Sequence, residues 1–167
     1  MTETDVTHRI FRLEDYFVGH TRAWGIFQDR FGKLRQQFIV DVNGTWDADK
    51  SELTLVEDFV YSDGATEQRV WTVTKQGETT YEGTTDGIIG TARIEALPGA
   101  VHLRYKLRMP MGGRTVALAF DDWMYRQDET VMINRASVTK GGILLGTATI
   151  CFQKTAPNGQ TATGSAD

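Results

Sequence analysis

Turn-forming dipeptides recur at short and regular intervals through most of the chain. They include Asp63-Gly64, Gln76-Gly77, Asp86-Gly87, Gly112-Gly113 and Gly141-Gly142. Glycine and aspartate accept the positive φ that tight hairpin connections need. The segments between these turns alternate apolar and polar residues, from Trp24–Arg30 to Leu144–Phe152, which is typical of strands with one buried face. The spacing therefore predicts about ten β-strands joined as an antiparallel meander.

One face of this predicted meander stays apolar from strand to strand. A hairpin turn fixes which residues face each other, and propagating the register brings apolar residues together in pairs such as Val42 with Leu55, Tyr105 with Phe120, and Ile133 with Ile150. A long, twisted sheet with one apolar face should close on itself. The sequence thus predicts an all-β fold, a single antiparallel meander closed into a lipocalin-like barrel. A two-sheet sandwich is the alternative.

One short helix is expected before the strands. Ile10, Leu13 and Phe17 fall on one helical face, and Gly19 can end the helix. We expect this helix to pack on one end of the barrel as a lid. Residues 1–154 then form a single barrel domain, and the polar tail 155–167, rich in threonine and glycine, is predicted to be disordered.

Four charged residues fall on the predicted inner face. Glu57 and Arg69 lie diagonally near each other on adjacent strands, and Asp122 is predicted directly opposite Arg135. Burying a charge is costly unless it is paired and hydrogen-bonded, and here each acid is expected to have an arginine in reach. The pairs are either structural and fix the register, or polar anchors in a mostly apolar cavity.

Small residues on the inner face favour a cavity over a fully packed core. Gly44, Gly83, Gly90, Ala92, Gly146 and Ala148 leave volume unfilled, and aromatic residues, among them Trp24, Phe38 and Phe59, line the remainder. The candidate ligand-binding residues are Glu57, Arg69, Trp71, Tyr81, Tyr105, Asp122 and Arg135.

Three functions are compatible with this pattern. The first is binding of a small apolar or amphipathic ligand, a carboxylate-bearing one included, with an inner arginine as its anchor. The second is an enzyme such as an isomerase or lyase with Glu57 or Asp122 as acid or base, although a neighbouring arginine should lower the pKa of each carboxyl. The third is a solid barrel with a surface interaction role at the outward Trp123, for which a homodimer is one form.

Signals for other functions are weak. The three histidines are scattered, and the chain has no nucleophile elbow, P-loop or dinucleotide fingerprint. We therefore expect no metal and no cofactor, and the catalytic residues of any enzyme are unknown. A net charge of −4 argues against nucleic-acid binding, and no apolar run is long enough for a transmembrane helix. Met1–Arg12 has no signal-peptide pattern, so a cytoplasmic location is expected.

Several motifs resemble a bacterial family of proteins of unknown function. They are Leu13-Glu14-Asp15-Tyr16-Phe17, Trp24-Gly25-Ile26-Phe27-Gln28-Asp29-Arg30, Glu57-Asp58-Phe59-Val60-Tyr61, Asp121-Asp122-Trp123-Met124 and Asn134-Arg135-Ala136. The resemblance covers nearly the whole chain apart from the tail. Members of this family are often described as lipoproteins, and this chain departs from them in showing no lipid-accepting cysteine near its start. The resemblance implies a bacterial source and assigns no activity.

Overall fold

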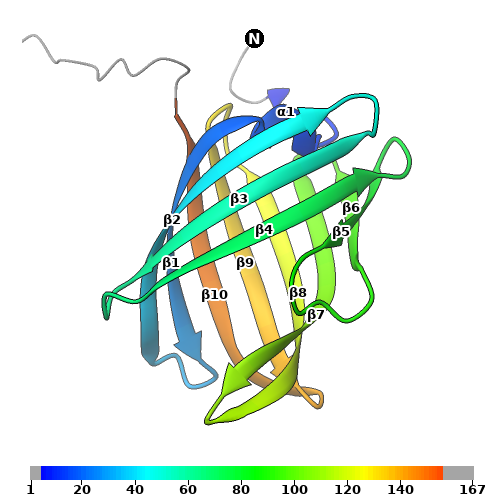
Figure 1. The fold of residues 1–167 in the computed structure, drawn as a ribbon. Helices are drawn as coiled ribbons and strands as arrows, with labels where there is room; N and C mark the ends of the chain where they lie inside the picture. Colours follow the sequence, from blue (N-terminus) through cyan, green and yellow to red (C-terminus); the bar gives the residue numbers. More distant parts are fainter. Residues whose placement is uncertain (1–4, 156–167) are drawn as a thin grey trace, which may run out of the picture.

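The computed structural model describes residues 5–155, which form one short helix and ten strands (Figure 1). The elements are α1 (Leu13–Phe17), β1 (Gly19–Asp29), β2 (Leu34–Asp47), β3 (Glu52–Tyr61), β4 (Thr66–Lys75), β5 (Thr80–Thr84), β6 (Ala92–Leu97), β7 (Ala100–Met111), β8 (Arg114–Arg126), β9 (Val131–Lys140) and β10 (Ile143–Lys154). Each strand pairs with the next, and β10 pairs with β1. The predicted meander barrel is confirmed. Most of the predicted tail lies outside the described residues, so its disorder stays a prediction.

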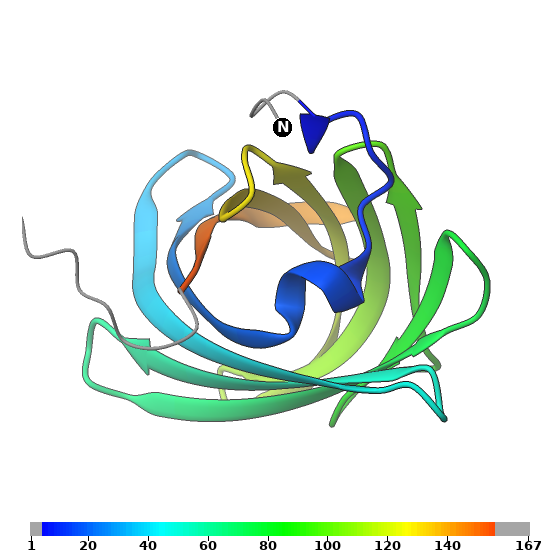
Figure 2. The same ribbon diagram turned by 90° about the horizontal axis from the view of Figure 1, so that it is seen from above.

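The lid predicted at the N-terminus is confirmed, with a different set of contacts. Seen from above, α1 lies across one end of the barrel (Figure 2). Its Leu13, Tyr16 and Phe17 are buried, whereas Ile10 is 41% exposed and forms a bridge with Pro98. Gly44 on β2 makes this docking possible, because a Cβ there would overlap the carbonyl oxygen of Phe17. This small inner residue therefore makes room for the helix backbone.

Polar contacts hold α1 to the surrounding strands. The hydroxyl of Tyr16 donates a hydrogen bond to the carbonyl oxygen of Thr130 at 2.8 Å. The carboxylate of Glu14 accepts hydrogen bonds from Lys75 on β4 and Tyr81 on β5. The cost of burying these polar groups is offset because each has a partner.

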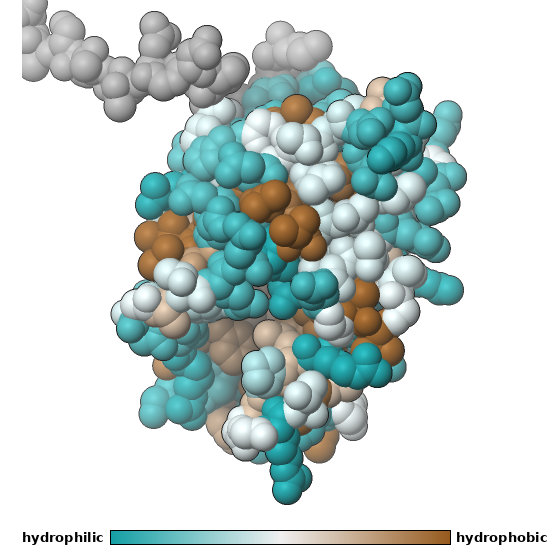
Figure 3. Space-filling view, viewed as in Figure 1, coloured by the Kyte–Doolittle hydropathy of each residue, from teal (hydrophilic) through white to brown (hydrophobic). Residues whose placement is uncertain are grey.

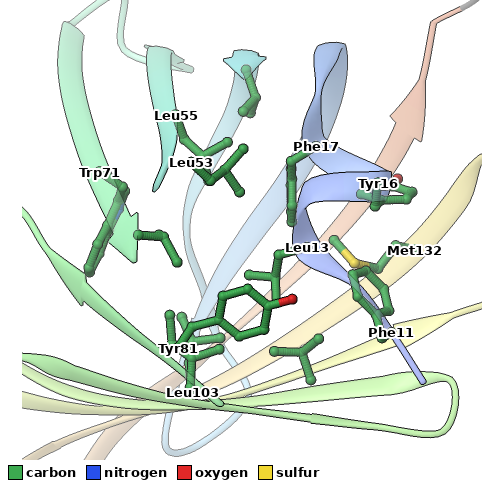
Figure 4. Close-up of a cluster of buried hydrophobic side chains, with 14 of the residues drawn as sticks. Phe11, Leu13, Tyr16, Phe17, Leu53, Leu55, Trp71, Tyr81, Leu103 and Met132 are labelled. Carbon is green, nitrogen blue, oxygen red and sulfur yellow. The ribbon is translucent and has the colours of Figure 1, made fainter. Parts of the chain in front are cut away.

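The hydrophobic core is concentrated beneath α1 (Figure 4). Figure 4 shows side chains of α1 close to Leu53 and Leu55 of β3 and to Met132 of β9. Phe17 also meets Phe152 edge-on, with ring centroids 6.1 Å apart. The inward apolar positions at this end of the barrel are thus filled by side chains.

The strand registers differ from the predicted ones at several hairpins. Val42 pairs with Glu57 and Gly44 with Leu55, a shift of two residues. Such a shift leaves the same face of each strand inward, because the side-chain period of a strand is two. Ile94 with Leu103 and Tyr105 with Phe120 pair as predicted.

The prediction for β9 was wrong because its register is shifted by one residue. Asp122 pairs with Ala136, and Arg135 pairs with Trp123 on the outer face. The connection after β8 is closed by a hydrogen bond from Gln127 N to Val131 O, and the Asp128 carboxylate accepts hydrogen bonds from Thr130 N and Val131 N. The predicted pairing of Asp122 with Arg135 requires a connection one residue shorter than this loop, and a one-residue slip exchanges the two faces of a strand.

Candidate ligand cavity

A cavity of about 230 Å³ lies inside the barrel, next to the core beneath α1. Its apolar lining consists of Phe38, Val40, Phe59, Trp71, Leu103, Leu107, Met109, Phe120, Met124, Ala136, Ala148, Ile150 and Phe152. Its polar lining consists of Glu57, Tyr61, Glu67, Arg69, Tyr105 and Asp122. In the space-filling view, a recess with apolar atoms on its floor lies in the lower half of the molecule (Figure 3).

Aromatic rings give the cavity flat walls. Tyr105 on β7 and Phe120 on β8 are direct partners in the sheet, and their rings stack with centroids 4.8 Å apart. Trp71 on β4 meets Tyr105 edge-on at 5.2 Å. These arrangements are the favourable ones for aromatic pairs and restrict how the rings move.

Asp122 is a deeply buried carboxyl group of the cavity. The residue is 7% exposed, and its Oδ2 accepts a hydrogen bond from the hydroxyl of Tyr105 at 3.2 Å. Its Oδ1 is buried and has no hydrogen-bond partner within residues 5–155. Burial raises the pKa of Asp122 to about 7, the hydrogen bond from Tyr105 opposes the rise, and the neighbouring charge of Asp121 adds to it.

Glu57 is a second cavity carboxyl whose ionisation is disfavoured. It lies opposite Arg69 in the register of β3 and β4. Burial raises its pKa to about 7; the positive charge of Arg69 lowers this pKa, while the negative charges of Asp122 and Glu67 raise it. The expected lowering by an arginine is therefore present at Glu57 but is outweighed by burial, and no arginine contributes at Asp122.

The guanidinium group of Arg69 is committed to groups other than Glu57. Its Nη1 donates a hydrogen bond to the backbone oxygen of Asp86 at 3.0 Å, and Nη2 lies 3.4 Å from Oε1 of Glu67. The Arg69 side chain is 17% exposed. Glu67 also accepts a hydrogen bond from the hydroxyl of Tyr61 at 2.8 Å. Arg69 thus ties β4 to the segment that follows β5.

Arg69 lies where the sheet is incomplete. β5 pairs with β4 only from Thr72 to Lys75. The earlier part of β4 lies beside segment 85–91 without a backbone ladder, and we call this boundary, which side chains bridge, the seam. Across this seam, Thr85 Oγ1 also donates to Val70 O at 2.8 Å. On its other side the segment pairs with β7 through Ile88 and Leu107.

Five of the seven sequence-predicted site residues come together in this cavity. They are Glu57, Arg69, Trp71, Tyr105 and Asp122. Tyr81 is buried but belongs to the polar contacts under α1. Arg135 is exposed on the outer face, as is Trp24, which is 42% exposed.

Sequence reasoning missed Glu67 and Tyr61. Each lies two residues from a predicted inner residue, Glu67 from Arg69 and Tyr61 from Phe59. Residues two apart in a strand lie on the same face, so the period of two could have identified both.

In residues 5–155, no group of three or more His, Cys, Asp or Glu side chains could hold a metal ion. No helix in that range is long and apolar enough to cross a membrane.

Comparisons with known proteins support the fold and the sequence resemblance. A family model described as a protein of unknown function (DUF3833) matches residues 1–154. No curated protein matches the chain. An S-type phycobiliprotein lyase from Guillardia theta has a similar structure, with 12% identity, a TM-score of 0.68, and 95% of this chain and 99% of that chain covered. A DUF3598 protein of unknown function from Nostoc punctiforme gives 12% identity and a TM-score of 0.62, with 89% of this chain and 51% of that chain covered. At this identity, the likeness to solved structures shows the barrel fold alone.

Proposed function

The chain belongs to the DUF3833 family of proteins of unknown function, and we propose that it binds a small, largely apolar molecule inside its barrel. The observation that carries the proposal is the internal cavity, whose lining includes Asp122, a buried carboxyl group with one oxygen that has no hydrogen-bond partner among the described residues. A mostly apolar and aromatic cavity with a few convergent polar groups is the usual composition of a ligand site.

The size of the cavity limits the ligand. Sites for drug-sized molecules have volumes of roughly 300–1,000 Å³, whereas this one has about 230 Å³. A ligand with one ring, or with a short branched chain, fits this volume. The stacked rings of Tyr105 and Phe120 favour a flat ligand.

An anionic ligand anchored by arginine is not favoured. The expectation of a carboxylate-bearing ligand depended on Arg69 and Arg135, and Arg135 lies outside the barrel. The remaining inner arginine, Arg69, is already bonded to Glu67 and to backbone oxygen. We therefore propose a ligand without a carboxylate.

Native mass spectrometry of the freshly purified protein tests this function. We expect an extra mass bound to the wild-type chain, released by denaturing extraction. The Ala136→Leu variant should lose it, because Ala136 lines the cavity and a leucine side chain occupies part of its volume. Ala117→Leu is the matched control, since Ala117 is exposed on the outer face of β8. Equal ligand content in wild type and in Ala136→Leu would contradict binding in this cavity.

A second candidate function is catalysis in the same cavity. Two carboxyl groups with a pKa of about 7, Glu57 and Asp122, are suited to proton transfer near neutral pH. Incubating the extracted ligand with the wild type and with Asp122→Asn, then comparing its mass and retention time, tests this function. A product formed only by the wild type supports an enzyme, and an unchanged ligand supports a binding protein.

A further inference from the structure

We infer that the ligand of this cavity is a small amine attached to an apolar or aromatic ring, whose cationic nitrogen pairs with Asp122 and Glu57. This inference rests on the proposed function and specifies the chemistry of its ligand. It is carried by the geometry and charge of the cavity.

The first observation is the unsatisfied acceptor on Asp122. Its Oδ1 is buried, lacks a hydrogen-bond partner within the described residues, and belongs to a residue that lines the cavity. A buried acceptor without a partner is costly, more so when it carries charge. Tyr105 donates to the other oxygen of the same carboxyl group. A cationic group of a ligand in the cavity would offset the missing hydrogen bond by stabilising the charge of the same carboxyl group.

The second observation is the excess of acidic groups around the cavity. Glu57, Glu67 and Asp122 line it, whereas Arg69 is the lining cation. The carboxylate of Glu67 forms an ion pair with Arg69 and neutralises part of its positive charge. Ionised Asp122 and Glu57 thus lack full compensation, and a ligand with a positive charge provides it. Bound water would supply a donor but no charge.

The third observation is the aromatic wall beside these carboxyl groups. Tyr105 stacks on Phe120 and contacts Trp71 edge-on. The faces of such rings attract cations, and this attraction strengthens when water is excluded. Carboxylates and aromatic rings together favour a cationic amine over a neutral alcohol or an anion.

Three probes with the same ring test the inference: phenethylamine, 2-phenylethanol and phenylacetate. They differ in their head group, which is respectively a cation, a neutral hydroxyl and an anion. Chemical-shift titration of the ¹⁵N-labelled protein detects millimolar affinity, and the indole N–H signal of Trp71 reports directly on the cavity. We expect phenethylamine to bind at least tenfold more tightly than 2-phenylethanol, and phenylacetate to bind weakest.

Variants of the carboxyl groups separate charge from shape. Asp122→Asn should weaken phenethylamine binding at least tenfold and change 2-phenylethanol affinity less than twofold. Glu57→Gln should also weaken amine binding, which provides a second variant if one fails to fold. Asp58→Asn is the matched control, because Asp58 lies next to Glu57 but is exposed on the outer face.

The pH dependence gives an independent readout. Phenethylamine stays cationic between pH 5.5 and 8.5, so its binding should tighten several-fold as the cavity carboxyls ionise. The charged and titratable groups around Asp122 and Glu57 are Tyr105 on β7, Arg69 and Glu67 on β4, and Asp121, which is next to Asp122 on β8 but on the outer face. The tightening should be reduced in Asp122→Asn.

The outcomes distinguish this inference from the proposed function. Tightest binding of phenylacetate, or equal binding of all three probes in the cavity, overturns the amine inference and leaves a ligand-binding barrel. No binding of any probe, with a clean apo mass in native mass spectrometry, overturns both. Amine-selective binding that is unchanged in both carboxyl variants also overturns the inference.

Discussion

Replacing Asp122 by asparagine should stabilise the protein at neutral and alkaline pH. The wild-type carboxyl is buried, and one of its oxygens has no partner within the described residues. Asparagine has nearly the same shape, keeps an acceptor for the hydroxyl of Tyr105, and carries no charge. The variant therefore removes the cost of ionising the group inside the barrel.

The pKa of Asp122 sets the size and sign of the effect. It is raised from 3.8 to about 7 in the folded state, a change of about three pH units, each corresponding to about 1.4 kcal/mol. Between these two values the unfolded chain has released the proton and the folded protein retains it, so raising the pH lowers the free energy of unfolding. The loss reaches about 4 kcal/mol near pH 7 and then levels off.

Urea unfolding between pH 4 and 9 measures this effect. Wild type and Asp122→Asn should be nearly equally stable at pH 4, and the variant should be more stable by up to about 4 kcal/mol at pH 8. Glu57, whose pKa is also raised to about 7, should leave part of the slope in the variant. Asp58→Asn, at an exposed carboxyl, should follow the wild-type curve. Parallel curves for wild type and Asp122→Asn would refute the reasoning.

Three further substitutions test the fold around the cavity. Gly44→Ala should lower the free energy of unfolding by about 2 kcal/mol in urea unfolding, because the added methyl group would overlap the carbonyl oxygen of Phe17; unchanged stability would mean that α1 docks differently. Tyr16→Phe should cost about 1 kcal/mol in the same assay through loss of the hydrogen bond to Thr130 O, and no loss would contradict that bond. Arg135→Ala should change stability by less than about 0.5 kcal/mol and leave the ligand content in native mass spectrometry unchanged, since Arg135 is on the outer face; a lost ligand would place it in the site after all.

Sequence periodicity was sufficient to predict the barrel and most of its inner face. Errors of two residues at a turn, such as the one between β2 and β3, do no harm to this prediction. The face of β9 could not be predicted, because the length of the loop after β8 depends on hydrogen bonds to the Asp128 carboxylate. Several conformations of such a loop are compatible with one sequence.

The inner face of β10 was predicted correctly because two errors cancelled. The predicted pairing of Ile133 with Ile150 ignored a bulge, where the register between β10 and β9 shifts between Leu144 and Gly146. The observed partner of Ile150 is Asn134. The loop before β9 and the bulge after it each shift the register by one residue relative to the prediction. The two shifts together leave Ile150 and Phe152 on the inner face, as predicted. Strand patterns alone do not reveal a bulge, which adds one residue to one strand only.

For the polar residues of the cavity, the sequence predicted which carboxyl groups point inward but not which groups they contact. Glu57 and Asp122 are inward carboxyls, as their alternation indicated. Their expected arginine partners depended on register, and the shift of β9 removed Arg135 from Asp122. The commitment of Arg69 to Asp86 O could not be predicted, because it depends on how segment 85–91 crosses the sheet.

If the barrel binds a ligand as proposed, the seam between β4 and segment 85–91 would affect how quickly the ligand exchanges rather than how tightly it is held. Arg69 and Thr85 bridge this seam with side-chain hydrogen bonds. Separating the segment from β4 would break these hydrogen bonds but no strand ladder, and small local openings cost less free energy than global unfolding. The residence time of the proposed ligand would then depend on the seam, whereas its equilibrium affinity would depend on Asp122, Glu57 and the rings around them.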